Sequence, residues 1–261
     1  MRSSLRHLRQ IPPTVKYKTH NIMKIDLSKV KGLIFDYGGT LDTGGDHWSE
    51  IIWSAWQKAG VAVTKEEFRE AYVFAERELA RERHILPAHD FHDMMLIKMR
   101  IELQHLVSEG LMAPQAVEQK AVETARICYE AARDKVHAAS PVLQKLSERY
   151  PIVLVSNFYG NIETVLEDFG IRQYFRAIIE SAVLGVRKPD PRIFEHGVKA
   201  LGLQPSETLV IGDSYRKDIV PAESIGCQAI WLKGKGWTKE EDEVIHPNII
   251  GKLDEILGIL L

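Results

Sequence analysis

The sequence predicts an α/β protein with a parallel, Rossmann-like sheet and an all-helical insertion after the first strand. Short apolar runs at residues 32–35, 152–157 and 208–213 alternate with segments of helical periodicity, and polar residues end or follow each run. That alternation is typical of parallel strands joined by crossover helices. Residues 45–139, between the first two runs, carry helical periodicity and no strand pattern.

These patterns divide the chain into three parts. Residues 23–44 and 140–261 are expected to form the core domain, and residues 45–139 an inserted helical cap domain. Residues 1–22 contain basic residues, no acid, and a Pro12-Pro13 interruption. They are expected to be a disordered tail or an upstream mis-start, with Met23 opening the core.

Several helices are expected after the first strand. Thr64-Lys-Glu-Glu67 is a capping box that opens a helix running to about Arg83. A second helix should run from about Met94 to Glu109, where Gly110 stops it, and a third from Pro114 towards His137. Residues 141–149 are expected to form a separate helix that begins the return to the core.

Composition excludes several classes of protein. The chain has 261 residues, 45% of them hydrophobic, and a net charge of −2, so no overall field favours nucleic acid or a membrane surface. No apolar run approaches the roughly 20 residues of a membrane span. The two distant cysteines suggest no disulfide framework, which predicts a reducing, cytoplasmic location. We expect a monomer or homodimer acting on a small molecule.

The stretch that organises the chain runs from Gly32 to Asp42. A buried strand at residues 32–35 meets Asp36, and then Gly38 and Gly39 allow a tight turn with outward-pointing amide groups. Open α/β sheets bind ligands at the carboxyl ends of their strands, which is where Asp36 is expected.

Other polar groups should gather at the same edge. Ser156 and Asn157 end one predicted strand, Asp213 ends another, and Lys188 lies in a loop between strands. Two carboxylates 4 Å apart repel by about 4 kcal/mol at an effective dielectric constant near 20. Hard oxygen ligands suit Mg²⁺, so the sequence predicts a site for Mg²⁺ and a phosphate group.

At these residues the chain resembles the haloacid dehalogenase superfamily of hydrolases. Four segments carry the resemblance in order: Asp36-Tyr-Gly-Gly-Thr40-Leu41, Val155-Ser156-Asn157, Lys188-Pro-Asp190 and Gly212-Asp213-Ser-Tyr-Arg-Lys-Asp218. Any one of them is a weak signal, but the ordered set of four is a strong one. The helical insertion is similar to the cap that follows the first strand in part of this family.

The resemblance implies a role for each matching residue. Asp36 would be the nucleophile that forms an aspartyl intermediate, assisted by Ser156 and Lys188. Phosphate-binding groups would come from Thr40, Ser156, Asn157 and Lys188, with Asn157 also supporting the loop. The side chains of Asp36 and Asp213 and the backbone carbonyl of Gly38 would bind Mg²⁺. Asp218 would lie outside these ligands or hold Lys188.

The sequence departs from the family pattern at Gly38. Phosphatases of this family usually carry a second Asp there, which protonates the leaving group and later activates water. Such acid–base help contributes roughly 10²–10⁴ in rate. The chain could be a slow phosphatase, use another acid such as Asp42, act on a leaving group that needs no proton, or bind a phosphate ligand without turnover.

Two other enzyme classes stay open. Haloacid dehalogenases also lack the second Asp, but they typically lose the acid that corresponds to Asp213, which this chain keeps. Phosphonatases have a small residue at the position of Gly38 and use a cap lysine, for which Lys58, Lys65 and Lys98 are candidates. Each of these lysines is expected on the surface.

A few cap and loop residues invite a functional interpretation. His84, His89-Asp90 and His92-Asp93 cluster in a break between helices and are expected to form a solvated or substrate-facing loop more readily than a metal site. Trp48 is a candidate pocket residue, and Arg187 a candidate phosphate contact. Together the motifs favour Mg²⁺-dependent hydrolysis of a small phosphorylated metabolite.

Overall fold

The computed structural model describes residues 24–261, so the predictions for the basic segment 1–22 lie outside the described residues. Its centre is a six-stranded sheet, ordered β3-β2-β1-β4-β5-β6, in which every neighbouring pair of strands is parallel. The strands are β1 (Gly32–Phe35), β2 (Ile152–Ser156), β3 (Ala177–Glu180), β4 (Thr208–Gly212), β5 (Gln228–Leu232) and β6 (Ile249–Ile250). The predicted parallel α/β fold is confirmed, whereas β6 was not predicted.

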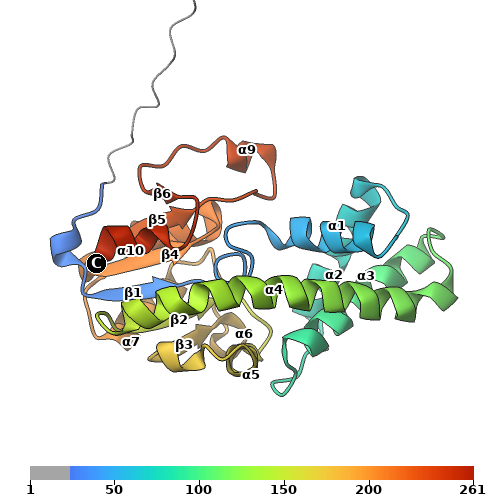
Figure 1. Cartoon of the computed structure of the whole chain (residues 1–261), viewed down its shortest axis with the longest axis horizontal. Helices are drawn as coiled ribbons and strands as arrows, with labels where there is room; N and C mark the ends of the chain where they lie inside the picture. Colours follow the sequence, from blue (N-terminus) through green and yellow to red (C-terminus); the bar gives the residue numbers. More distant parts are fainter. Residues whose placement is uncertain (1–23) are drawn as a thin grey trace, which may run out of the picture.

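Helices cover both faces of this sheet (Figure 1). In the central strand β1, Ile34 points into a core with Phe194 and Val198 of α7 (Arg192–Leu201). Leu33 and Phe35 belong to the larger core on the opposite face. At Gly197 of α7 an added Cβ would lie 2.8 Å from Ile34 Cδ1, so glycine permits the close approach of this helix to the sheet.

The larger core contains residues from α4 (Val117–Ser147), α5 (Ile162–Asp168) and α10 (Glu255–Leu260). Three short helices complete the connections between strands, namely α6 (Ser181–Leu184), α8 (Val220–Ser224) and α9 (Lys239–Asp242). A π-helical turn at Tyr215–Ile219 precedes α8. No helix within residues 24–261 combines the length and the apolar character needed to cross a bilayer.

The segment between β1 and β2 contains helices joined by turns and loops and no strand, as its periodicity predicts. It comprises α1 (Trp48–Lys58), α2 (Lys65–Arg81), α3 (Phe91–Ser108) and the first part of α4, which lie beyond one edge of the sheet (Figure 1). The predicted capping box at the start of α2 is present. Thr64 N donates to Glu67 Oε2 at 2.7 Å, and Glu67 N donates to Thr64 Oγ1 at 3.2 Å.

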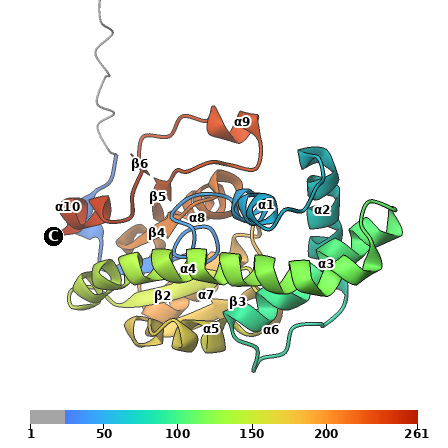
Figure 2. The same cartoon turned by 45° about the vertical axis from the view of Figure 1, so that its right-hand side comes forward.

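The prediction of two separate helices around Pro141 was wrong. α4 is one helix of 31 residues with Pro141 in its interior. Proline removes one backbone donor from a helix, but the flanking residues Ala139, Val142 and Leu143 are buried, and that packing carries the helix onward. α4 therefore runs without a break from the helical insertion onto the sheet (Figure 2), and the expected boundary at 139/140 falls inside it.

The helical insertion buries an acid that has no hydrogen-bond partner. Glu102 on α3 is fully buried, and neither of its carboxylate oxygens has a partner among the described residues. Burial raises the pKa of Glu102 to about 8, although the nearby charge of Lys98 opposes the shift. Glu76 also lies close enough to raise this pKa further.

Replacing Glu102 by Met should stabilise the protein at neutral pH. Because the folded pKa lies above the ordinary value of 4.5, the folded state binds more protons than the unfolded state between about pH 4.5 and pH 8. Folding stability contributed by this group therefore falls as the pH rises through that window. We expect Glu102→Met to raise the unfolding free energy by roughly 1–3 kcal/mol at pH 8.

Urea unfolding at pH 4.5 and pH 8 measures the effect, with Glu70→Met on the exposed side of α2 as the matched control. The stabilisation should be larger at pH 8 than at pH 4.5. An equal or smaller gain at pH 8 would show that Glu102 does not stay protonated in the folded state.

Candidate active site

The predicted polar groups meet at the carboxyl edge of three neighbouring strands. Ser156 ends β2, Asp36 follows β1, and Asp213 follows β4, and these strands are adjacent in the sheet. The backbone N–H of Asp36 donates to Ile211 O at 2.9 Å, so the strand pairing fixes the position at which this carboxylate leaves the sheet. The register of a parallel sheet thereby aligns residues that are far apart in the sequence.

Three carboxylates lie close together at this edge. Asp36, Asp213 and Asp218 each offer an oxygen, and these oxygens lie within 4.8 Å of one another. The Thr40 hydroxyl lies 2.9 Å from Asp36 Oδ2 and 3.0 Å from Asp213 Oδ1. Since a hydroxyl has one proton, it can donate fully to only one of these carboxylates at a time.

Lys188 supplies a buried positive charge to the cluster. Its Nζ donates to Asp36 Oδ1 at 2.5 Å and to Asp218 Oδ1 at 2.7 Å. Burial disfavours the charged ammonium, but the charges of Asp218 and Asp36 outweigh that penalty and raise the pKa of Lys188 above its ordinary value. Lys188 is therefore a fixed cation, and Asp218 holds it against Asp36.

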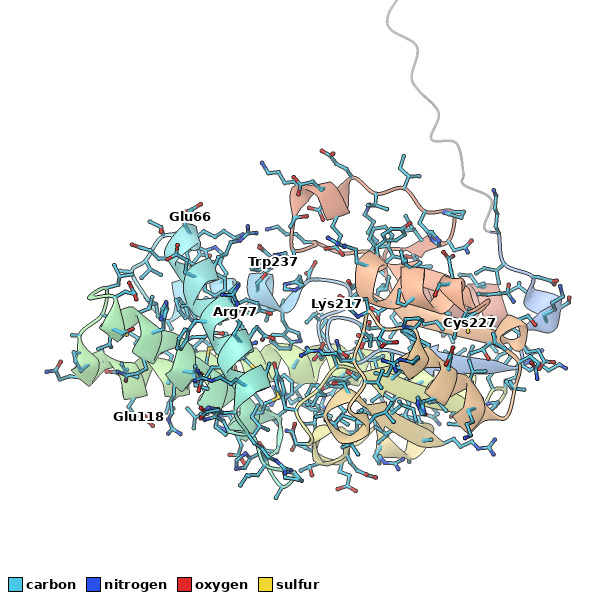
Figure 3. The ribbon with its side chains drawn as sticks, turned by 180° about the vertical axis from the view of Figure 1, so that it is seen from behind. Glu66, Arg77, Glu118, Lys217, Cys227 and Trp237 are labelled. Atoms are coloured by element: carbon cyan, nitrogen blue, oxygen red, sulfur yellow. The ribbon has the colours of Figure 1, made fainter. Side chains whose placement is uncertain are left out.

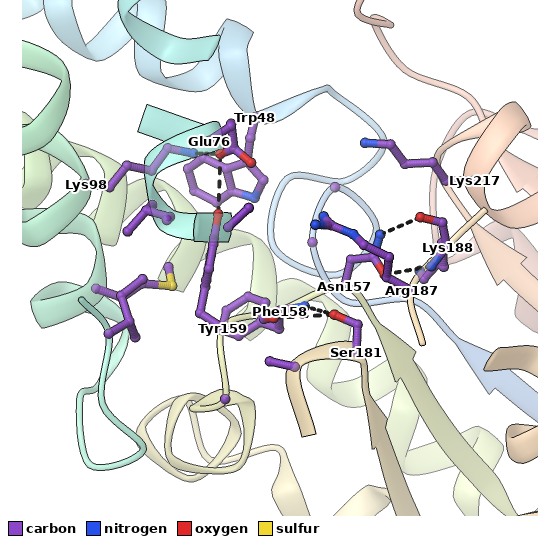
Figure 4. Close-up of a pocket in the computed structure, with 18 of the residues that line it drawn as sticks. Trp48, Glu76, Lys98, Asn157, Phe158, Tyr159, Ser181, Arg187, Lys188 and Lys217 are labelled. Carbon is purple, nitrogen blue, oxygen red and sulfur yellow. Dashed lines mark hydrogen bonds and ion pairs between the residues drawn. The ribbon is translucent and has the colours of Figure 1, made fainter. Parts of the chain in front are cut away.

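Two side chains at the end of β2 support this arrangement. The Ser156 hydroxyl donates to Asp36 Oδ1 at 3.4 Å. Asn157 Oδ1 accepts from the backbone N–H of Lys188 at 2.8 Å, and its Nδ2 donates to the Lys188 carbonyl at 3.0 Å (Figure 4). Both halves of the Asn157 amide thus hold the loop that carries Lys188, so its visible role is positioning.

The residues at this cluster fit a divalent cation. Burial, together with the charges of Asp36 and Asp218, raises the pKa of Asp213 well above its ordinary value. A cation would relieve that repulsion. The carbonyl of Gly38 accepts no hydrogen bond from the residues that the structure describes, whereas the next carbonyl, of Gly39, accepts from Gly45 N at 2.7 Å. Carboxylate and carbonyl oxygens together suit Mg²⁺.

The two glycines of the first motif, Gly38 and Gly39, differ in whether a side chain would fit in their place. Gly39 has φ +99°, and a Cβ there would lie 2.3 Å from Asp213 Oδ2, so only glycine fits. Gly38 has no such φ, and a Cβ added to it would meet no atom within 4 Å. The absence of an acid at residue 38 is therefore not imposed by space.

Asp42, the nearest alternative acid, is buried within the loop. Its Oδ1 accepts from Gly39 N at 2.7 Å, and its Oδ2 accepts from Trp48 Nε1 at 3.0 Å. Burial raises the pKa of Asp42 to about 8, while these two hydrogen bonds favour its charged form. With both oxygens occupied by donors, Asp42 organises the turn around Gly38 and Gly39.

A cavity of about 770 Å³ lies between the carboxylate cluster and the helical insertion. Trp48 lines it, as the sequence suggested, and so does Arg187 (Figure 4). The prediction that Lys98 lies on the surface was wrong, because it is 5% exposed and lines this cavity. Lys58 is exposed as expected, and Lys65 pairs with Glu50 at 2.6 Å.

The histidine-rich break contributes less chemistry than its composition suggests. His84 lies 3.1 Å from Glu78 and, with Glu82, forms a cluster of possible metal ligands. Arg81, however, pairs with Glu78 at 2.5 Å and with Glu82 at 3.5 Å, which offsets their charges. Asp90 caps α3 by accepting from Asp93 N at 2.8 Å.

Comparisons with known proteins agree with this fold. A family model described as haloacid dehalogenase-like hydrolase matches residues 30–226. The chain is 35% identical over 83 residues to the Bos taurus protein named haloacid dehalogenase-like hydrolase domain-containing protein 3, a match covering 32% of this chain and 33% of that one. It is 37% identical over 92 residues to the glyceraldehyde 3-phosphate phosphatase of Methanocaldococcus jannaschii, covering 35% and 40%.

The solved structure of a dehalogenase with an intermediate complex shares the fold, with a TM-score of 0.59 and 17% identity over 89% of this chain and 97% of that one. The chain spans between 33% and 44% of the length of the first three curated relatives that it matches. Because the family model covers most of the described core and insertion, the chain belongs to the haloacid dehalogenase-like hydrolase family.

Mg²⁺ should stabilise the folded protein through the carboxylate cluster. A ligand that binds only the folded state at 100 times its Kd adds about 2.7 kcal/mol. We expect Mg²⁺ to raise the melting temperature of the native chain, and Asp213→Asn to remove that shift. The variant should also melt higher than the native chain in EDTA, since it relieves the repulsion.

Differential scanning fluorimetry with and without Mg²⁺ measures both effects, and Asp134→Asn on the exposed face of α4 is the matched control. A metal site at this cluster would be contradicted if Mg²⁺ left the melting temperature of the native chain unchanged. It would also be contradicted if Mg²⁺ raised the melting temperature of Asp213→Asn as much as that of the native chain.

Proposed function

We propose that this protein is a Mg²⁺-dependent hydrolase of small phosphate monoesters, acting through an aspartyl-phosphate at Asp36. The observation that carries the proposal is the juxtaposition of Asp36, Asp213 and Asp218 around the buried ammonium of Lys188. Family membership and the phosphatase named among its relatives support the same chemistry. The metal ligands would be Asp36, Asp213 and the carbonyl of Gly38.

The chain's own residues account for the first chemical step. An oxygen of Asp36 attacks phosphorus, the bond from phosphorus to the ester oxygen breaks, and the leaving group departs as an alkoxide that takes up a proton. Lys188 offsets the charge of the phosphate and fixes Asp36, while Ser156 and Thr40 donate hydrogen bonds at the same edge. Mg²⁺, when bound, supplies charge neutralisation and orientation of the phosphate.

In the second step water attacks phosphorus of the aspartyl-phosphate. The bond between phosphorus and Asp36 breaks, which releases inorganic phosphate and restores the carboxylate. Neither step has a side chain at residue 38 to give or take a proton. We therefore propose slow turnover for substrates with poor leaving groups.

Helices α1 to α3 and the first part of α4 would act as the cap, with residues 45–139 as the cap domain and residues 23–44 and 140–261 as the core. The cavity lined by both parts supports this division. Closure of such a cap would exclude water and select the substrate. The buried free thiols Cys128 and Cys227 are compatible with the expected cytoplasmic location.

Carbon–phosphorus and carbon–halogen cleavage remain the alternative chemistries. Lys98 lines the cavity, but the carboxylate of Glu76 outweighs burial and raises its pKa, which opposes the neutral amine that a Schiff base requires. The retention of Asp213 also favours phosphorus over halogen chemistry. The remaining alternative is a protein that binds a phosphate ligand without turnover. The following measurement distinguishes that alternative from a phosphatase.

Phosphate release from a broad panel of monoesters should require both Mg²⁺ and Asp36. We expect Asp36→Asn to lower kcat at least 10³-fold, because an amide is a poor nucleophile and the covalent route is lost. Malachite-green detection of phosphate, with Asp134→Asn as control, measures the effect. If the native chain binds Mg²⁺ yet releases no phosphate from any monoester, it is a binding protein rather than a phosphatase.

Placing an acid at residue 38 should accelerate the reaction selectively. The open space beside Gly38 accommodates Gly38→Asp. We expect kcat/KM to rise by roughly 10²–10⁴ for alkyl phosphates, whose leaving group needs a proton, and to change little for p-nitrophenyl phosphate. The ratio of the two rates measures the effect. Equal activity of both proteins on alkyl phosphates would show that another group already supplies the proton.

A further inference from the structure

One wall of the cavity carries a group of polar side chains that the proposed chemistry does not use. Glu76 on α2, Lys98 on α3 and Tyr159, which follows β2, meet there (Figure 4). Lys98 Nζ donates to Glu76 Oε1, and the Tyr159 hydroxyl donates to the same oxygen at 3.3 Å. These contacts join the helical insertion to the core beside the cavity.

The second oxygen of Glu76 is left available. Oε2 accepts no hydrogen bond from the residues that the structure describes, and the Glu76 side chain is 36% exposed while lining the cavity. Burial disfavours its charge, but Lys98 outweighs that penalty and lowers the pKa of Glu76. Glu76 is thus an ionised acceptor that can only receive a hydrogen bond from a ligand.

The ammonium of Lys98, by contrast, is already paired with the carboxylate of Glu76. Its side chain is 6% exposed, and its Nζ lies 4.5 Å from the centre of the Tyr72 ring. An ion pair with one buried member and one partly exposed member contributes little to stability. The free oxygen of Glu76 in the cavity is consistent with a role in binding a ligand.

The surroundings decide which donor suits this oxygen. The Glu76–Lys98 pair is neutral as a unit, and Lys217 and Arg187 also line the cavity without a side-chain partner among residues 24–261. Figure 3, seen from behind, places Lys217 between the helical insertion and the sheet. Because Lys98 already offsets the charge of Glu76, a ligand ammonium would be repelled by Lys98 at the same carboxylate, whereas a hydroxyl donates a hydrogen bond without adding charge.

Part of the remaining wall of the cavity is aromatic. Trp48, Tyr72, Phe91 and Phe158 line it, together with aliphatic residues such as Met95. Aromatic rings pack well against the C–H surface of a carbon chain or ring, whose hydroxyls still need polar partners. A volume of about 770 Å³ accommodates a small phosphorylated metabolite together with water.

We propose that Glu76 Oε2 accepts a hydrogen bond from a hydroxyl of the leaving group, so that the substrates are phosphate monoesters of polyols or sugars. The inference rests on the proposed phosphatase function and names its substrate class. Glu76 is a specificity residue in this scheme, since it contacts the far end of the substrate and not the reacting phosphorus.

The test compares two kinds of substrate in two proteins. The double variant Glu76→Leu/Lys98→Met removes the pair without leaving a buried charge unpaired. Its kcat/KM for glycerol and hexose phosphates should fall roughly ten- to a hundredfold, the range expected for losing one hydrogen bond to a charged group. Its kcat/KM for p-nitrophenyl phosphate, which has no hydroxyl at that end, should stay within about twofold.

Glu70→Gln, exposed on the same helix, is the control and should change neither value. An equal loss on both substrates, or a native preference for aminoalkyl phosphates over polyol phosphates, would overturn the assignment of Glu76. The two proposals fail differently: without phosphate release from any monoester the hydrolase itself is refuted, whereas turnover without hydroxyl selectivity refutes only the role of Glu76.

Discussion

The arrangement of the site depends on one buried ammonium held between carboxylates. Lys188 contacts both Asp36 and Asp218, while Asp213 approaches from the neighbouring strand end. Three acids, two buried and one half-buried, near one cation leave an excess of negative charge, and such an excess is costly in a site of low dielectric. The same imbalance supports the proposal that the cluster binds a divalent cation together with the phosphate of a substrate.

The central residues of this site could be predicted because the topology of a parallel sheet determines where the ends of its strands lie. Apolar runs that end in Asp36, Ser156 and Asp213 identify strands, and parallel strands bring their carboxyl ends to one edge. The packing of the helical insertion was harder to predict, because helical periodicity identifies the buried face of a helix but not the residues that pack against it. Lys98 and Glu102 occupy the same apolar stripe of α3 as Met95 and Met99, and that placement was the available signal that they are buried.

Two other features could not be predicted from the sequence, for physical reasons. Pro141 normally ends or bends a helix, but the packing of α4 against the sheet overrides that local preference. The pairing of Glu76 with Lys98 joins two helices separated by a turn, and only the tertiary packing of α2 on α3 determines which face each residue presents. Residues that act through such contacts have no fixed spacing in the sequence by which they could be detected.

The segment after β2 links the two ends of the cavity. Ser156 contacts the carboxylate of Asp36, Asn157 holds the backbone of Lys188, and Tyr159 reaches Glu76 in the helical insertion. A shift of the insertion relative to the sheet would therefore act on a residue three positions from Ser156, which contacts Asp36. In the proposed mechanism Gly38 supplies no proton, so placement of the substrate by this segment would add to the charge neutralisation by Lys188 in lowering the barrier.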